Sequence, residues 1–329
     1  MKNNKPQLFK TLGILLALSI LLALSTAVAM AASYPSQPVR LIVPSSVGGA
    51  DDTIARLLSP KLSERLGKPV IVENHGGAGG IMGTEVGARA DPDGHTLLMV
   101  LGFQTIQPAL RKLPFDLVES FAPIAKMGVG PFVLVVHPSV PANSVKEFIA
   151  LAKQKPGKLI CATAGLGGSA HMGFELIQRL ADIKLKIVHF KSGSSSVIDI
   201  VGGHSDAVLG TIPTVLTYIK SGKLRVLGSG GVKRSGVLPD VPTIAEAGIP
   251  GFTLTQWWGI LAPAGTPAPI VERLTNEFKA ILALDEIKNW FLSQGAEVDY
   301  MGPTELGPFI AEEIAKWKRV VKEANIKLE

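Results

Sequence analysis

The sequence has one cysteine, few aromatic residues and little excess charge. A single cysteine among 329 residues excludes an internal disulfide, and Cys161 lies in an apolar run, so we expect a buried and inert thiol. Aromatic residues make up only 6% of the chain, and its net charge of +6 comes without a long run of Lys and Arg. These features argue against nucleic acid as a partner.

The sequence also lacks the motifs of common enzymes. It has no GxSxG around Ser169, no HExxH, no GxxxxGK[ST], and no pair of its six histidines has metal-ligand spacing. The GLGGSA turn at residues 165–170 does fit G-x-G-x-x-A, but Lys191 and Ser192 stand where a nicotinamide enzyme usually has an acid. These two residues suit a 2′-phosphate, so an NADP-linked oxidoreductase is the enzyme alternative. We expect no catalytic residue, no metal and no cofactor.

The N-terminus has the form of a secretory signal. Lys2, Lys5 and Lys10 precede an apolar run over residues 12–30, and small residues surround a cleavage point near Ala31. We therefore assign residues 1–31 to a signal peptide and expect a periplasmic protein. The run is almost long enough to span a bilayer, so an uncleaved anchor is the alternative.

Strands and helices alternate along the rest of the chain. Hydrophobic residues make up 47% and charged residues 18%, which predicts a globular α/β protein, and the length favours two lobes. The pattern predicts parallel sheets covered on both faces, with ligands beyond the carboxyl ends of the strands. Ser144 and Glu147 form a capping box. The expected strands are 39–43, 69–73, 95–100, 121–127, 131–137, 159–163, 185–190, 206–210, 224–229 and 257–261, and the expected helices include 53–66, 145–153 and 305–322.

Two glycine-rich loops follow strands in different halves of the chain. Residues 159–163 form an apolar strand, after which Gly165, Gly167 and Gly168 lead to Ser169 at the start of a helix. Backbone N–H groups exposed at such a helix start favour an anion. The upstream loop, residues 44–52, is similar but ends in Asp51 and Asp52, which are typical helix-capping acids. The pair predicts a ligand with a carboxylate, held from both sides.

The segments IVPSSVGGADDTIARLL, VENHGGAGGIMG, ADPDGHTLL, PALRKLPFD, TAGLGGSAHM, LPDVPTIAEAGIPGF and WWGILAPAGTP resemble, in order, those of Bug-type periplasmic receptors of tripartite tricarboxylate transporters. The resemblance implies a two-lobed type II periplasmic binding fold with crossing hinge strands. It also implies a non-catalytic monomer that holds a small carboxylated metabolite through backbone N–H groups, hydroxyls and waters, and delivers it to a membrane permease. A ligand-sensing partner of a signalling protein is the alternative.

The resemblance assigns residues 32–132 and 256–329 to the first lobe and 133–255 to the second. It places an acid, Asp206, near the floor of the cleft. The chain departs from the family at Ser45, where an aromatic is usual, at Ala50-Asp51 in place of Gly-Thr, and at Gln107, where Asn is usual. The expected ligand-binding residues are Ser45, Ser46, Val47, Gly48, Gly49, Asp52, Thr163, Ala164, Gly165, Gly167, Gly168, Ser169, His171, Lys191, Ser192, Gly193, Ser194, Ser195 and Asp206.

Overall fold

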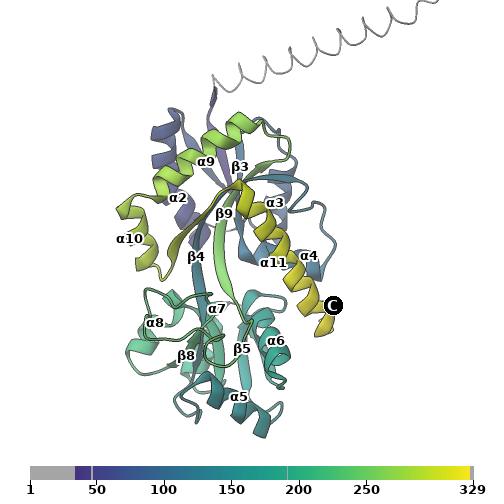
Figure 1. The fold of residues 1–329 in the computed structure, drawn as a ribbon, viewed down its shortest axis with the longest axis vertical. Helices are drawn as coiled ribbons and strands as arrows, with labels where there is room; N and C mark the ends of the chain where they lie inside the picture. The colour runs from purple at the N-terminus through teal and green to yellow at the C-terminus, as the bar shows by residue number, and fades with distance from the viewer. Residues whose placement is uncertain (1–33, 46, 191, 327–329) are drawn as a thin grey trace, which may run out of the picture.

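The chain folds into two lobes joined at a waist (Figure 1). The computed structural model describes residues 34–45, 47–190 and 192–326, so the expected signal peptide lies outside the described part. None of the helices in that part combines the length and apolar character needed to cross a membrane. A ten-stranded sheet runs through both lobes in the order β2-β1-β3-β9-β4-β7-β5-β6, and β10 and β8 also pair with β4.

The first lobe has apolar clusters on both faces of its part of the sheet. One cluster lies under α2, α9 and α10, and the other lies under α3 and α11. The elements are β1 (Val39–Val43), α2 (Ala50–Leu66), β2 (Val70–Asn74), η1 (Ala78–Gly80), α3 (Ile81–Ala88), β3 (Thr96–Leu101), η2 (Gly102–Thr105), α4 (Gln107–Leu110), β9 (Thr255–Pro263), α9 (Ala268–Leu282), α10 (Asp285–Ser293), β10 (Glu297–Met301) and α11 (Pro303–Glu323).

The second lobe is built in the same way, with α5 and α6 over one cluster and α7 and α8 over the other. Helix α5 starts as predicted, because the Ser144 hydroxyl accepts the Glu147 N–H at 3.2 Å. Cys161 is buried as expected, and burial raises the pKa of its thiol. The elements are α5 (Val145–Gln154), β5 (Ile160–Ala164), α6 (Ser169–Ala181), β6 (Lys186–Phe190), α7 (Gly193–Val201), β7 (Ala207–Thr211), α8 (Ile212–Lys220) and β8 (Arg225–Ser229).

One long strand, β4 (Phe121–Val136), belongs to both lobes. It pairs with β9 from Phe121 to Pro131 and with β7 from Phe132 to Val136. This corrects the expectation of two separate runs, 121–127 and 131–137. Register shifts beside Pro123 and Gly128 let the strand pass its proline and glycine positions without ending. The change of partner lies next to the lobe boundary that we propose at residues 132 and 133.

The sheet is mixed and not parallel throughout, which corrects a second expectation. Strands β1, β2 and β3 are parallel to one another, as are β5, β6 and β7. Strands β4 and β9 lie between the two groups and run antiparallel to their neighbours β7 and β3. The chain crosses the waist along these strands, which gives the fold its crossing hinge.

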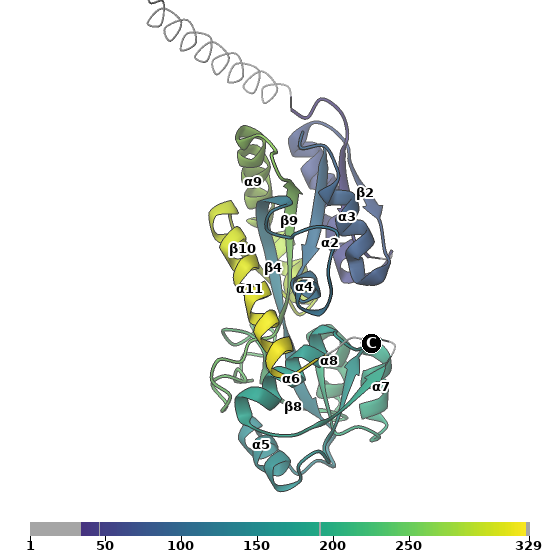
Figure 2. The ribbon, with the colours of Figure 1, turned by 90° about the vertical axis from the view of Figure 1, so that its right-hand side faces the viewer.

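Helix α11 reaches from the first lobe to the second (Figure 2). Leu306 and Ile310 pack in a first-lobe cluster, whereas Trp317 and Val320 pack in the second-lobe cluster beside α6. An ion pair of 2.8 Å joins Glu323 near the helix end to Arg179 of α6. The last turns of a segment that the sequence assigned to the first lobe therefore contact the second.

Candidate functional site

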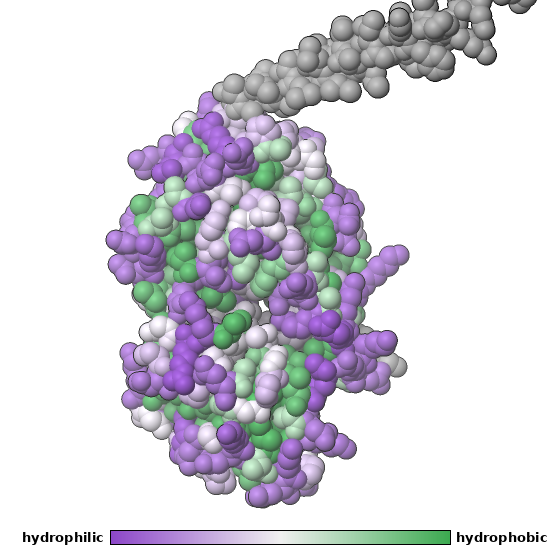
Figure 3. Space-filling model, in the orientation of Figure 1, coloured by the Kyte–Doolittle hydropathy of each residue, from purple (hydrophilic) through white to green (hydrophobic). Residues whose placement is uncertain are grey.

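The loops that follow the parallel strands face the waist. An interlobe cavity of about 500 Å³ is lined there by Gly48 and Thr53 of the first lobe and by residues 211–214 of the second. Residues 211–214 follow β7, and β5 is the parallel neighbour of β7, so the loop after β5 lies at the same edge of the sheet. Figure 3 shows that the molecular surface narrows between the two lobes.

The walls of the interlobe cavity are mostly apolar. Trp258, Trp290 and Phe291 line it, together with Leu101 and Phe103. The indole N–H of Trp258 is buried without a partner among the described residues. The polar lining of the cavity consists of hydroxyls and amides, and the described residues that line it include no Lys, Arg, Asp or Glu. The cavity therefore suits a ligand with an apolar body.

A second cavity, of about 340 Å³, lies beside the first on the first lobe. Leu101 and Phe103 line both cavities, and the rest of the second one is formed by the loops after β1 and β2 and by Gln104. We call it the lobe-1 cavity. Ser45 and Asp51 line it from the first loop, and Gly76, Gly77, Gly79 and Gly80 line it from the second.

Asp52 fixes the loop between β1 and α2. Its Oδ2 accepts the Gly48 N–H at 2.9 Å, and its Oδ1 accepts Arg56 Nε at 2.9 Å. Burial acts to raise the pKa of Asp52, but the hydrogen bonds from Arg56 and Gly48 outweigh burial and hold it below the ordinary value. The carboxylate therefore acts on the loop, and its bonds are already made within the protein.

Asp51, its neighbour, has no such partners. The residue lies in the first turn of α2 and is only 5% exposed. Its Oδ2 is buried and makes no hydrogen bond with any described residue. Buried carboxylate oxygens normally have a donor, so this one is an exception within the first loop.

The loop before α6 presents an uncapped helix start. Gly168 is the N-cap without a side-chain bond, the first turn contains no acid, and the first backbone bond closes only at Met172 N–H to Gly168 O, 3.0 Å. The N–H groups of Ser169, Ala170 and His171 therefore precede the intrahelical ladder. A β-carbon on Gly168 would lie 2.7 Å from the Ala164 carbonyl oxygen, so the turn has room only for glycine there.

Histidine side chains support the same loop. His171 is buried, and its Nδ1 accepts the Gly167 N–H at 2.9 Å. Its ring meets that of His189 edge to face with centroids 4.8 Å apart, and the Thr163 hydroxyl is 2.7 Å from His189 Nδ1. Burial lowers the pKa of His189, and His171 lowers it further against the opposing charge of Glu175. His171 thus orients the loop by accepting the Gly167 N–H at its Nδ1.

Helix α7, by contrast, caps itself. The Ser192 hydroxyl accepts the Ser195 N–H at 3.2 Å, and the Ser195 hydroxyl accepts the Ser192 N–H at 3.0 Å. The expected ligand groups of this loop are therefore already engaged in the turn. Gly193 and Ser194 stand in its first turn, at least partly exposed.

The remaining expected residues fall in different places. Gly48 lines the interlobe cavity, Ser45 lines the lobe-1 cavity, and Ser46 and Lys191 lie outside the described residues. Asp206 is corrected, because it lies at the amino ends of β5 and β7, where its Oδ2 accepts the Ile160 N–H at 2.7 Å. That is the sheet edge opposite the loops, and the acid closes a turn there. Val47 is exposed, and Gly49, Ala164 and Gly165 stand in the same two loops.

Sequence reasoning missed part of the cavity wall. Thr211 and Thr214 line the interlobe cavity from the β7–α8 junction, and Trp290 and Gln294 line it from α10 and the turn that follows. Neither α8 nor α10 was among the expected helices. Pro213 at the second position of α8 was a usable signal, since proline is common at the first turn of a helix. No group of three or more potential metal ligands occurs in the part of the chain that the structure describes.

A family model described as tripartite tricarboxylate transporter family receptor matches residues 54–326. The chain belongs to this receptor family. Among curated proteins, this receptor is 34% identical to Protein BugT of Bordetella pertussis over 99% of each chain. As its family membership implies, it is a solute-binding receptor that serves a membrane transporter.

Solved structures extend the likeness. The R. palustris protein Rpa4515, solved with adipate, is 30% identical with a TM-score of 0.76, over 89% of this receptor and 99% of that chain. MatC from Rhodopseudomonas palustris, solved with bound malate, is 31% identical with a TM-score of 0.72, over 88% and 100%. The two-lobed periplasmic binding fold expected from the sequence is thus confirmed.

Proposed function

We propose that this receptor binds a small carboxylate between its lobes, in the periplasm, and delivers it as a monomer to the permease of a tripartite transporter. The observation that carries the proposal is the open start of α6. Its first N–H groups have no side-chain cap, the first turn contains no acid, and the loop lies at the sheet edge that also supplies the wall of the interlobe cavity.

The energetics of such a site suit a soluble metabolite. A helix N-terminus contributes ~0.3 to 1 kcal/mol toward an anion at the surface and up to ~2 kcal/mol when partly buried. Hydrogen bonds to a charged group contribute ~1.5 to 3 kcal/mol each. Several of these terms, reduced by the cost of association, support binding at about −8 kcal/mol, which is micromolar. The apolar walls add affinity for a ligand with a hydrocarbon body, such as the adipate of Rpa4515.

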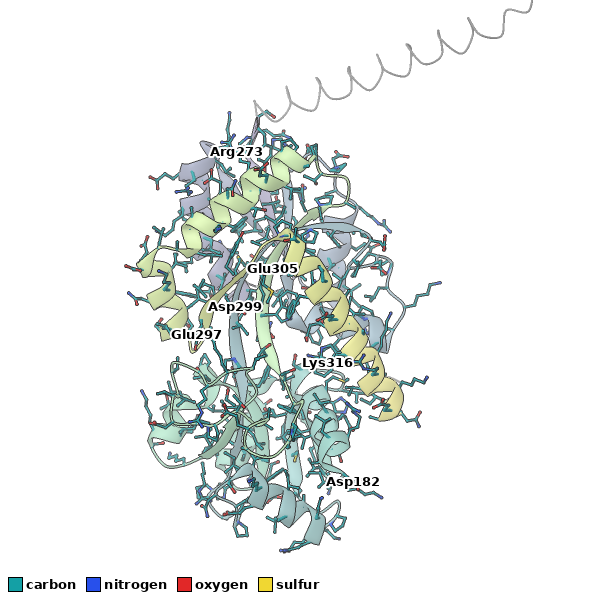
Figure 4. The ribbon with its side chains drawn as sticks, viewed as in Figure 1. Asp182, Arg273, Glu297, Asp299, Glu305 and Lys316 are labelled. Atoms are coloured by element: carbon teal, nitrogen blue, oxygen red, sulfur yellow. The ribbon has the colours of Figure 1, made fainter. Side chains whose placement is uncertain are left out.

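Closure of the lobes would signal occupancy to the permease. Backbone hydrogen bonds hold the chain together beside the crossing strands, where Phe132 N–H donates to Leu254 O at 3.1 Å and Leu254 N–H donates to Gly230 O at 2.8 Å. Glu297 of β10 lies where the lobes meet and accepts the Gly236 N–H at 2.7 Å (Figure 4). Contacts that form only when both lobes engage the ligand would shift the receptor toward a closed state.

Tryptophan fluorescence tests the proposal. Because Trp258 and Trp290 line the interlobe cavity, titration with malate, adipate or citrate is expected to change the emission with a saturable, micromolar midpoint. NADP serves as the negative control. A response to NADP and to none of the carboxylates would contradict the proposal and favour an oxidoreductase. Analytical ultracentrifugation with and without carboxylate checks the monomer.

A further inference from the structure

The lobe-1 cavity contains an acceptor that no donor satisfies. Among the described residues that line the cavity, Asp51 carries the only charged side chain. Asp51 is only 5% exposed, and its Oδ2 has no hydrogen-bond partner among the described residues. A carboxylate oxygen removed from water without a donor carries a desolvation cost, so each such group in a folded protein calls for an explanation, of which a bound donor is one.

Its neighbour shows that the loop is able to satisfy an acid when the acid is structural. Asp52 receives the Gly48 N–H and Arg56 Nε, each at 2.9 Å. Asp51 occupies the same first turn of α2 and receives neither. Asp52 is thus the acid that holds the turn, which leaves Asp51 without a comparable role in the fold.

A second buried acceptor lies behind the same cavity. Gln107 is 3% exposed, and its Oε1 also lacks a partner among the described residues. It packs behind Gly79, because a β-carbon on Gly79 would lie 3.2 Å from Phe103 Cε1 and 3.6 Å from Gln107 Nε2. Both Gly79 and Phe103 line the cavity. Two buried acceptors, one lining the lobe-1 cavity and one behind it, thus lack a donor among the described residues.

We propose that Asp51 accepts a hydrogen bond from an ammonium group of the ligand. The inference rests on the proposed function, since it assigns the carboxylate of that ligand to the open start of α6 and its ammonium to the lobe-1 cavity. The ligand is then an amino carboxylate, and a simple carboxylate of the same shape leaves Asp51 unpaired. Leu101 and Phe103 line both the interlobe cavity and the lobe-1 cavity, so these two cavities adjoin.

Matched pairs of probes test the proposal by calorimetry on the mature receptor. The pairs are aspartate and succinate, glutamate and glutarate, and 2-aminoadipate and adipate. Within the pair that fits the cleft best, the amino member is expected to bind at least about tenfold more tightly, as one charge-assisted hydrogen bond requires. Asp51→Asn should remove most of that preference, because its amide accepts from ammonium only weakly and is able to donate to a carboxylate.

The control is Asp285→Asn, the same change in the first turn of α10 at an exposed acid, which should leave both affinities unchanged. Circular dichroism verifies that each variant is folded. Equal binding of the two members of a pair, or an unchanged preference in folded Asp51→Asn, would overturn the ammonium assignment and leave the carboxylate receptor standing. Binding of no probe, with or without an amine, would overturn the carboxylate class and this inference together.

Discussion

Each glycine-rich loop is held by one side chain, which we call its brace, and the two braces differ in their chemistry. In the first, the Gly48 N–H is held by Asp52, four residues further on, and in the second the Gly167 N–H is held by His171, again four residues further on. One brace is a carboxylate and the other an imidazole. Each helix start has free N–H groups, but only α2 has acids in its first turn.

The difference explains how one cleft is able to recognise two kinds of group. An imidazole brace leaves the start of α6 free to attract an anion. The acids of α2 offset the same attraction at the first loop, and Asp51 lines the lobe-1 cavity. The two loops look equivalent in sequence, but we therefore expect them to bind different ends of one ligand.

The largest expected effect is on the anion side of this comparison. Gly168→Ala places a methyl group 2.7 Å from the Ala164 carbonyl oxygen, so the loop must shift away from its present path. We expect affinity for the carboxylate found by fluorescence to fall at least about tenfold, since the N–H groups at the helix start lose their common direction. Gly307→Ala in α11 is the control, because a β-carbon there would lie 3.5 Å from Pro123 Cγ, an ordinary contact. Unchanged affinity in folded Gly168→Ala would remove the α6 loop from the site.

Asp52→Asn tests the brace of the first loop. The change removes the ion pair with Arg56, and we expect a loss of about 1 to 3 kcal/mol in the free energy of unfolding, measured with urea. Because the folded pKa of Asp52 lies below its ordinary value, this stability is present above pH ~4 and is lost as the pH falls through the folded pKa. The two proteins should therefore converge in acid. A wild-type advantage that persists there would contradict the assignment.

The sequence could locate both loops because glycine and small polar residues interrupt strands that are otherwise apolar. It could also have separated Asp52 from Asp51, since Arg56 follows Asp52 at the i, i+4 spacing of helical ion pairs. Nothing local indicates that Asp51 is buried. The turn at residues 76–80, more than twenty residues away, lines the same cavity, and a β-carbon on Gly80 would lie 3.0 Å from the Pro44 carbonyl oxygen of the first loop, so this arrangement is set by the tertiary fold.

Other parts of the site depend on the tertiary fold. The sequence predicted two separate runs, 121–127 and 131–137, and only the pairing of β4 with β9 and then with β7 shows that one strand continues through both. Thr211 and Thr214 gave no glycine signal, yet the position of β7 beside β4 brings them to the cavity. Asp206 followed the family pattern, but strand direction sets it at the far edge. The sequence pattern predicts the strands and helices, whereas the pairing of the strands decides which strand ends lie together.

Two serine variants distinguish the role of the uncapped start of α6 from that of the capped start of α7. Ser192→Ala removes the cap of α7 and should cost about 1 kcal/mol of stability with little change in affinity. Ser169→Ala, at the uncapped start of α6, should weaken carboxylate binding by roughly threefold to tenfold and change stability less, if its hydroxyl contacts the ligand. Calorimetry and thermal unfolding measure the two quantities. The opposite pattern would make α7 the anion site and α6 a structural turn.

The smallest effect distinguishes the two braces by pH. Burial and His171 hold the pKa of His189 below its usual 6.5, so the unfolded chain takes up more protons between the folded pKa and about pH 6.5. This part of the stability is present above pH ~6.5 and is lost as the pH falls through the folded pKa. The effect is small because the His189 side chain is largely in contact with water.

Wild type should lose more thermal stability than His189→Gln between pH 7.5 and 5.5, with His204→Gln as the exposed control. The first loop should not contribute to the pH dependence in this range, since the Asp52 carboxylate that holds it titrates only in acid. Equal losses of thermal stability in all three proteins would show that the histidine pair does not stabilise the second loop.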